Sequence, residues 1–136
     1  VGSDFSTGLI DICAERGLEV KLADALHLPY RTNAFDYALN IAVLHHISSE
    51  SRRVMLVRET MRVLRVGGVA LFYAWAYEQS QGGVSGHVFE GSDVLVPFSK
   101  DEAVLQRYCH VYREGELAQL FRELSWCIVE RAYFDC

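Results

Sequence analysis

The segment that most constrains this chain runs from residue 35 to residue 47 and is apolar at alternating positions and at many of the positions between them. Successive side chains of a strand point to opposite faces, so this pattern is typical of a central strand in a covered sheet. A helical pattern follows in residues 50–64, and residues 69–76 return to an apolar strand pattern. This alternation predicts an α/β fold with an open, mostly parallel sheet and helices on both faces.

The remaining elements follow from cap and periodicity signals. Ser6 and Gly17 bound an expected helix over residues 7–16, and Gly67-Gly68 is expected to end the central helix. We expect further elements over the following ranges: a strand at 18–23, a loop at 26–33, a helix at 117–124 and a last strand at 126–134. Residues 79–107 show no sustained period, so they are expected to form a long irregular loop on the substrate side.

Length and composition limit the class of protein. The 136 residues, 51% of them hydrophobic and 23% charged, favour one globular domain over residues 1–136. The net charge of −5 means that any contact with phosphate must be local. The apolar runs are shorter than the roughly 20 residues of a membrane span. We therefore expect an intracellular protein without a membrane partner, located in the cytoplasm or the nucleus.

The four cysteines give no metal-binding signature. They lie far apart, without a Cys-x-x-Cys pair and without histidines at the spacing of zinc ligands. Spacing alone therefore predicts free thiols and no metal site.

Two acidic residues lie where parallel strands end. Ligands of an open parallel sheet bind beyond the carboxyl ends of its strands. Asp4 could accept hydrogen bonds from two ribose hydroxyls there, and Asp24, with Ala25 and Leu26, could border an adenine ring. The alternatives are an N-cap for Asp4 and a turn residue for Asp24.

A histidine pair and two arginines extend the candidate site. His45 and His46 are expected at the end of the central strand, where an imidazole could move a proton or donate to a substrate oxygen. The alternative for each is a structural histidine, which is the commoner case at the end of a strand. Arg52 and Arg53 lie in the first turn of the following helix, where basic residues oppose the helix dipole. That position favours a role in binding, although a solvated helix face is the alternative.

Several strings together resemble one known family, the S-adenosylmethionine-dependent tRNA methyltransferases that esterify 5-carboxymethyluridine at the wobble position. The more restrictive strings are Ile41 to His46 (IAVLHH), Trp75-Ala76 with Glu78-Gln79, and His110 to Leu117 (HVYREGEL). The likeness spans nearly the whole chain. It implies a class I methyltransferase fold of the Rossmann-like kind, with S-adenosylmethionine as cofactor.

The resemblance also implies roles for individual residues. Asp4 would hold the cofactor's ribose, Asp24 with Ala25 and Leu26 would border its adenine, and Ile41 with Ala42 would line its methionine arm. A second group would meet the modified base or its phosphates: His45, His46, Arg52, Arg53 and Arg113. The implied partners are a tRNA anticodon loop and a small zinc-binding activating subunit, and some members are fused to an AlkB-like dioxygenase.

The resemblance leaves alternatives open. The family's first strand with its glycine-rich loop and its closing strand have no counterpart here, so we expect a fragment that is inactive alone and binds S-adenosylmethionine weakly or not at all. Two other functions are compatible with these residues: a catalytically silent regulatory module, and a methyltransferase that acts on a small molecule.

Overall fold

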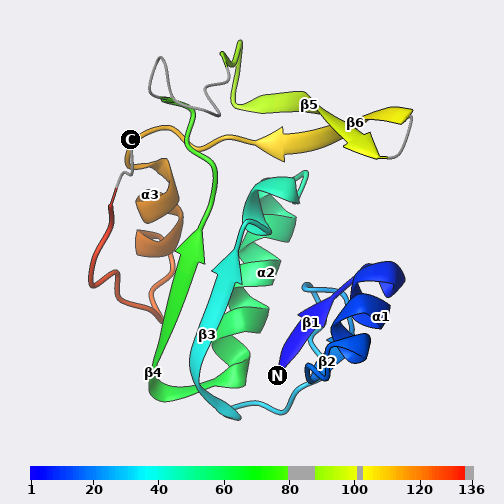
Figure 1. Cartoon of the computed structure of the whole chain (residues 1–136). Helices are drawn as coiled ribbons and strands as arrows, with labels where there is room; N and C mark the ends of the chain where they lie inside the picture. Colours follow the sequence, from blue (N-terminus) through cyan, green and yellow to red (C-terminus); the bar gives the residue numbers. More distant parts are fainter. Residues whose placement is uncertain (80–87, 101–102, 134–136) are drawn as a thin grey trace. The chain divides into compact units, whose positions relative to one another are not determined.

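The computed structural model describes residues 1–79, 88–100 and 103–133, and of Lys100 only the backbone (Figure 1). The chain divides into two compact units. The first comprises Val1–Leu39 and Ser51–Leu71, and the second comprises Asn40–Glu50 and Phe72–Cys136. Strands pair two by two, as β1 with β2, β3 with β4, and β5 with β6.

The first unit begins with a small βαβ motif. Strand β1 (Gly2–Asp4) pairs in parallel with β2 (Val20–Leu22), and helix α1 (Thr7–Glu15) connects them. The Ser6 hydroxyl accepts a hydrogen bond from the Leu9 N–H at 3.4 Å, and Gly17 has a φ of 70°, so both expected boundary signals are confirmed. The parallel pair with its helical crossover also confirms the expected α/β class.

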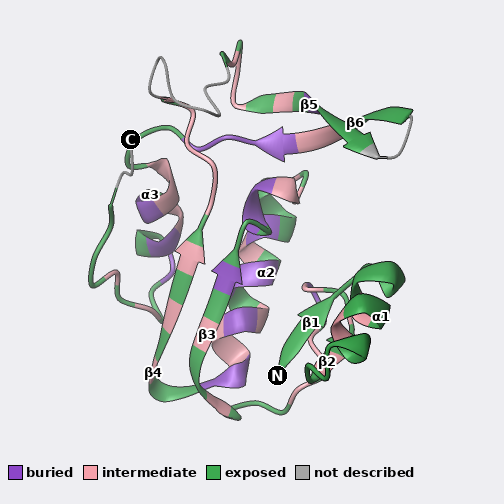
Figure 2. Cartoon of the chain, viewed as in Figure 1, coloured by how far each residue is buried: buried purple, intermediate pink, exposed green. Residues whose placement is uncertain are grey.

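Strand β3 (Phe35–Ile41), helix α2 (Glu50–Val63) and strand β4 (Leu64–Tyr73) follow the expected order. Helix α2 buries one face, which includes Leu56 and Val57, and this face appears purple in Figure 2. The expectation of a covered central strand is wrong, because Tyr37 and Leu39 are 75% and 74% exposed. Within the described residues, β3 pairs with β4 alone, so apolar composition did not bring burial on both faces.

The expected helix end at Gly67-Gly68 is also wrong. Helix α2 ends at Val63, and both glycines lie within β4. At position 68 a side chain would clash with the backbone, because a Cβ atom would lie 2.9 Å from the Arg65 carbonyl oxygen and 3.1 Å from that of Asp36. Gly68 therefore marks a close approach of β4 to β3, and Gly67 has a φ of 79°, which favours glycine.

The expected loop at 26–33 is confirmed, and α2 holds it in place. The Glu59 carboxylate accepts from the Leu28 N–H at 2.9 Å. The Arg62 guanidinium donates to the carbonyl oxygens of Leu28 and Tyr30 at 3.0 and 2.9 Å. Arg62 also lies 2.8 Å from Glu59, which lowers the pKa of that carboxyl group.

The second unit contains a short 3-10 helix η1 (Leu44–His46), strands β5 (Asp93–Lys100) and β6 (Ala103–His110), and helix α3 (Glu116–Arg122). Strands β5 and β6 form an antiparallel hairpin. The expectation of an irregular stretch over 79–107 is therefore wrong for most of its described part. Pro97 and the polar Gln106 interrupt the apolar alternation, but an edge strand tolerates both.

The amphipathic helix near the C-terminus is confirmed as α3, whose Phe121 ring packs 4.7 Å from that of Phe72. The expected strand at 126–134 is wrong for residues 126–133, which have no regular structure, and Phe134 lies outside the described residues. Strand-like composition needs a pairing partner, and none of the described strands pairs with this segment. Among the described helices, none combines the length and hydropathy needed to cross a bilayer.

Candidate functional site

Asp4 and Asp24 lie at the carboxyl ends of neighbouring parallel strands. Asp4 ends β1 opposite Leu22, and Asp24 follows β2. One oxygen of each carboxylate closes a local turn: Asp4 Oδ1 accepts from the Ser6 N–H at 2.7 Å, and Asp24 Oδ1 accepts from the Leu26 N–H at 2.9 Å. The turn alternative is thus present in both cases, and it leaves the second oxygen of each carboxylate to accept from a ligand. Leu26 is buried beside this turn, and Ala25 is half-buried.

The last residues of β3 carry an unsatisfied acceptor, and the chain bends directly after them. Ala42 has a φ of 57°, which is disfavoured for a residue with a Cβ, and its N–H donates to the Tyr73 carbonyl oxygen at 3.0 Å. The Oδ1 atom of Asn40 is buried without a hydrogen-bond partner among the described residues. Asn40, Ile41 and Ala42 therefore present a polar acceptor next to an apolar side chain.

His45 and His46 lie on η1, one turn beyond the end of β3, instead of on the strand itself. His45 is 1% exposed, and its ring stacks on that of Trp75 with 5.2 Å between centroids. Burial, followed by the charges of His46 and Arg107, lowers the pKa of His45 from 6.5 to about 4. This imidazole is therefore neutral at pH 7.

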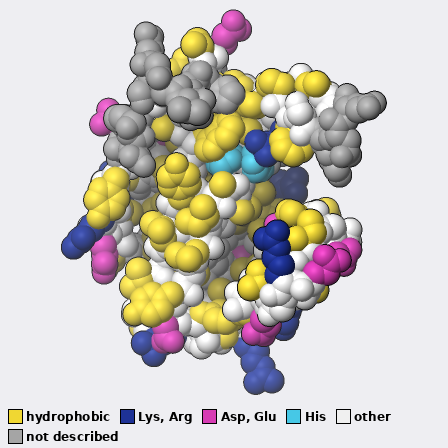
Figure 3. Space-filling view, viewed as in Figure 1, with side chains coloured by type: hydrophobic (Ala, Val, Ile, Leu, Met, Phe, Trp, Pro, Cys, Tyr) yellow, Lys and Arg dark blue, Asp and Glu magenta, His cyan; other side chains and the backbone are white. Residues whose placement is uncertain are grey.

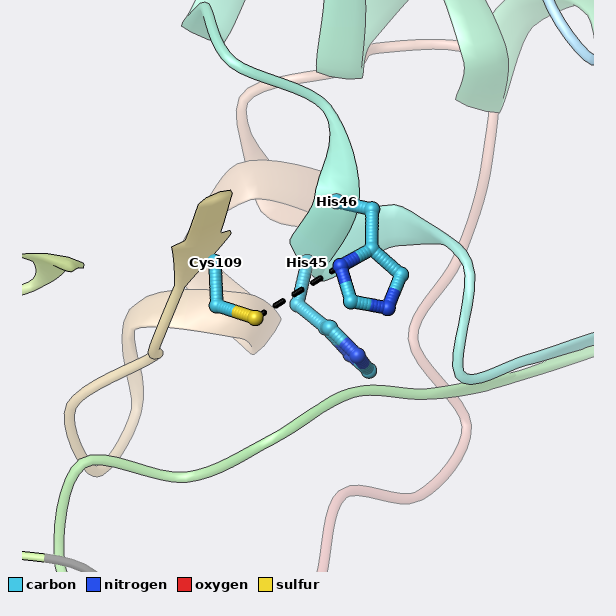
Figure 4. Close-up of side chains that lie close together, drawn as sticks. All are labelled: His45, His46 and Cys109. Atoms are coloured by element: carbon cyan, nitrogen blue, oxygen red, sulfur yellow. Dashed lines mark hydrogen bonds between the residues drawn. The ribbon is translucent and has the colours of Figure 1, made fainter. Parts of the chain in front are cut away.

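His46 is oriented by strand β6. Its Nδ1 atom lies 3.0 Å from the Tyr108 carbonyl oxygen and 3.5 Å from the Cys109 sulfur (Figure 4). A carbonyl oxygen can only accept, so Nδ1 carries the proton that it donates. Burial lowers the pKa of His46, and it raises the pKa of the Cys109 thiol. At pH 7 the three groups are thus two neutral imidazoles and a neutral thiol.

These three side chains also form a possible metal-binding group that sequence spacing did not indicate. One ligand atom from each of His45, His46 and Cys109 lies within 4.8 Å of the others. Cys109 is distant in sequence from the histidines, and only the contact of η1 with β6 brings it near. No local spacing rule could therefore have found the cluster.

Arg107 is a residue of this cluster that the sequence interpretation missed. Its guanidinium carbon lies 5.8 Å from the Trp75 ring centroid and 5.0 Å from that of Phe98. Its charge acts on both His45 and His46, lowering the pKa of each. The sequence does hold a signal: side chains two positions apart share one face of a strand, and this places Arg107 on the same face as Leu105 and Cys109. The lack of a sustained period over residues 79–107 as a whole hides this signal.

The remaining predicted arginines are placed differently from one another. Arg52 is exposed in the first turn of α2, whereas Arg53 is only 8% exposed. Arg113 is exposed, and its guanidinium lies 4.1 Å from the Tyr77 ring centroid. Arg53 is thus mostly buried, whereas Arg52 and Arg113 are exposed and can each reach a ligand.

The predicted residues fall into both units. Asp4, Asp24, Ala25, Leu26, Arg52 and Arg53 belong to the first unit, and Ile41, Ala42, His45, His46 and Arg113 belong to the second. The structure brings Asp4 near Asp24 in the first unit. In the second unit it brings the histidine pair together with Arg107 and Cys109.

A buried histidine ties the elements of the second unit together. His110 Nδ1 lies 3.0 Å from Asp93 Oδ1, and its Nε2 lies 2.8 Å from Glu116 Oε1. These contacts join β6 to β5 and to the start of α3. Tyr108, on the same strand, also donates its hydroxyl to Asp93. This network fixes the strand that carries Arg107 and Cys109.

Comparison with known proteins gives consistent matches. Residues 1–72 match the family described as "Methyltransferase domain". A tRNA (carboxymethyluridine(34)-5-O)-methyltransferase of Schizosaccharomyces pombe is 37% identical over 153 residues, covering 98% of this chain and 67% of that protein. The Xenopus tropicalis tRNA (carboxymethyluridine(34)-5-O)-methyltransferase alkbh8 is 33% identical over 189 residues, covering 99% of this chain. This chain spans only 30% of the length of the Xenopus protein.

A solved structure supports the fold. The SAM-dependent methyltransferase of Methanosarcina mazei superposes with a TM-score of 0.70 at 17% identity, covering 90% of this chain and 66% of that one. At this identity the likeness concerns the fold alone. The superposition shows a class I methyltransferase fold, and the sequence matches mean that this chain belongs to the methyltransferase family that includes the tRNA (carboxymethyluridine(34)-5-O)-methyltransferases.

Proposed function

We propose that this chain is part of an enzyme that transfers a methyl group from S-adenosylmethionine to the carboxylate of 5-carboxymethyluridine at the tRNA wobble position. The observation that carries the proposal is the match of nearly the whole chain to the S. pombe enzyme, at 37% identity. That match covers 98% of the chain, so it includes the segments that carry the histidine pair and Arg107 and extends beyond residues 1–72, which match the methyltransferase domain.

Residues of each unit, taken separately, suit one part of the cofactor. The second carboxylate oxygens of Asp4 and Asp24 would accept from the ribose hydroxyls and the adenine amino group. Asn40 Oδ1, which is buried and has no partner within the described part of the chain, suits the ammonium group of a methionine arm lying against Ile41 and Ala42. When bound, S-adenosylmethionine supplies a methyl group on a positively charged sulfur.

The proposed reaction needs no general base. The carboxylate is ionised at pH 7, and one of its oxygens donates an electron pair to the methyl carbon. As the new C–O bond forms, the C–S bond breaks and its electron pair remains on sulfur. The products are a methyl ester and S-adenosylhomocysteine, and no proton is released. The protein therefore has to position the carboxylate and exclude water.

Neutral histidines suit this task. A neutral imidazole can donate one N–H to the carboxylate and orient it. His45 and His46 are kept neutral by burial, as the lowered pKa of each indicates. Arg52 and Arg113, both exposed, would meet the phosphates of the anticodon loop. A small zinc-binding activating subunit and a cytoplasmic or nuclear location also belong to this proposal.

The test is a methylation assay with the full-length protein, with and without the activating subunit. The substrates are a tRNA that carries 5-carboxymethyluridine and the same tRNA with unmodified uridine at the wobble position. Mass spectrometry of the nucleosides should show one added methyl group on the modified base only. Methylation of both tRNAs, or only of a small-molecule acceptor, would overturn the proposal.

A further inference from the structure

Arg107 holds a positive charge between aromatic rings without an anionic partner from the described chain. Its guanidinium carbon lies 5.0 Å from the Phe98 ring centroid and 5.8 Å from that of Trp75. Its Nε atom is buried and has no hydrogen-bond partner among the residues described. No carboxylate of that part of the chain forms an ion pair with Arg107. The guanidinium also acts on the Cys109 thiol through a side-chain hydrogen bond, but a thiol at pH 7 is neutral. A partly desolvated guanidinium without a counter-charge costs free energy unless a ligand supplies the anion.

The neighbouring histidine adds a hydrogen-bond donor. The main-chain N–H of Trp75 donates to His45 Nδ1 at 3.3 Å, so Nδ1 carries the lone pair. A neutral imidazole has one protonated nitrogen, which here must be Nε2. Burial and the Arg107 charge keep this ring neutral by lowering its pKa to about 4. The cluster therefore presents an N–H donor close to a cation.

The same hydrogen bonds disfavour a metal ion in the group formed by His45, His46 and Cys109. A metal would need lone pairs, but Nδ1 of His45 uses its lone pair to accept from Trp75 and its Nε2 carries a hydrogen. Nδ1 of His46 donates to the Tyr108 carbonyl oxygen, so only Nε2 of His46 keeps a free lone pair among the two rings. The guanidinium of Arg107 would also repel a divalent cation. Figure 3 shows histidine side chains bordered by hydrophobic side chains and by a basic one. This composition suits an oxyanion.

We propose that Arg107, together with the Nε2–H of His45, binds an anionic oxygen of the substrate, and that this anion is the carboxylate of the modified wobble base. The inference rests on the proposed function and assigns to Arg107 the role of positioning the attacking group. A guanidinium can bind one carboxylate oxygen and leave the other oxygen free to attack the methyl carbon. The Trp75 and Phe98 rings would limit access of water to the same site.

A phosphate of the anticodon loop could supply the same oxyanion, so the experiment must distinguish the two sources. Binding is measured by fluorescence anisotropy with the full-length protein and two anticodon stem-loops. One carries 5-carboxymethyluridine at the wobble position, and the other carries the uncharged amide in place of the carboxylate. Both stem-loops have the same phosphates, so the ratio of their dissociation constants reports on the carboxylate alone.

For the wild type, the acid should bind about 10- to 100-fold more tightly than the amide, the range expected for charge-assisted hydrogen bonds. Arg107→Gln should abolish this preference while leaving the affinity for the amide unchanged. Arg107→Lys keeps the charge but loses the planar fork, so it should retain part of the preference. Arg122→Gln, which removes an exposed arginine from α3, is the matched control and should leave the preference intact.

Two results would overturn the assignment. If Arg107→Gln weakens both stem-loops equally, Arg107 contacts a phosphate. If the preference for the acid is absent in the wild type or survives in Arg107→Gln, the carboxylate lies elsewhere. A parallel methylation assay separates this inference from the proposed function. If binding prefers the acid through Arg107 but no ester forms, only the proposed function is contradicted. If the ester forms but binding shows no Arg107-dependent preference for the acid, only this inference is contradicted.

Discussion

The main-chain N–H of Trp75 donates a hydrogen bond to Nδ1 of His45 across 3.3 Å. This contact joins the segment after β4 to the 3-10 helix that follows β3. It sets the tautomer of a buried imidazole whose pKa is lowered to about 4. The histidine is therefore a fixed neutral donor, which is the property on which the proposed carboxylate site depends.

The stability of the protein should depend on pH through His45. In the unfolded chain this imidazole takes up a proton near pH 6.5, but in the folded chain it does so only near pH 4. Its contribution to stability is therefore complete above about pH 6.5 and is lost as the pH falls toward 4. The loss should amount to roughly 3 kcal/mol, and the lowered pKa of His46 acts in the same direction.

Urea unfolding at a series of pH values measures this effect. His45→Gln should flatten the dependence of the unfolding free energy on pH between 4 and 6.5. His27→Gln, a change of an exposed histidine, is the control and should leave the slope nearly unchanged. Equal slopes in the wild type and His45→Gln would mean that His45 is not held neutral.

Asp4→Asn should weaken S-adenosylmethionine binding without unfolding the chain. The asparagine side-chain oxygen can still accept from the Ser6 N–H, so the local turn is kept. The lost negative charge should reduce cofactor affinity by about tenfold, as expected for a hydrogen bond to a charged group. Calorimetry on the full-length protein measures the affinity, and Asp11→Asn, on the exposed part of α1, serves as the control. Unchanged affinity would remove Asp4 from the cofactor site.

Arg113→Ala and His46→Ala should each reduce ester formation while leaving cofactor affinity nearly intact. Arg113 is exposed beside the Tyr77 ring, where it can meet a tRNA phosphate. Loss of that contact should lower kcat/KM by about tenfold, and Arg113→Lys should recover part of it. Steady-state kinetics and cofactor titration are compared for each variant. An equal loss of cofactor binding and activity would show that the two residues support the fold instead.

Gly68→Ala should destabilise the first unit by about 1–3 kcal/mol. The added methyl group would lie 2.9 Å and 3.1 Å from two backbone carbonyl oxygens, which cannot move independently of the strands. Gly8→Ala in α1 is the matched control, since an added methyl group there would have no neighbour within 4 Å and alanine favours the helix. Thermal unfolding compares the two variants. Equal stability would show that β3 and β4 do not approach closely at Gly68.

The sequence predicted the elements that depend on local signals. Helix α1 has its Ser6 cap and Gly17 stop, and α2 and α3 have apolar faces of helical period, so their positions could be inferred from neighbouring residues alone. The positions of Asp4 and Asp24 at strand ends could be inferred for the same reason, because the strand pattern shows where each strand ends. Their roles toward a cofactor stay a prediction.

Features that depend on distant contacts could not be predicted in this way. The exposure of Tyr37 and Leu39 depends on which strands pair with β3, and no apolar pattern contains that information. The left-handed conformation of Ala42 ends β3 early and places His45 and His46 on a separate turn. Arg107 comes near the histidine pair only when β6 pairs with β5 and approaches η1.

The chemical stability of the transferred methyl group tests the central claim most directly. The full-length protein is incubated with isotopically labelled S-adenosylmethionine and a tRNA that carries 5-carboxymethyluridine, and the product is treated with mild alkali. A methyl ester hydrolyses under these conditions, so the account predicts that the label is released as methanol and that the carboxylate is recovered. Label that remains on the nucleoside after alkali, as it would on a ring nitrogen or a ribose oxygen, would contradict the account.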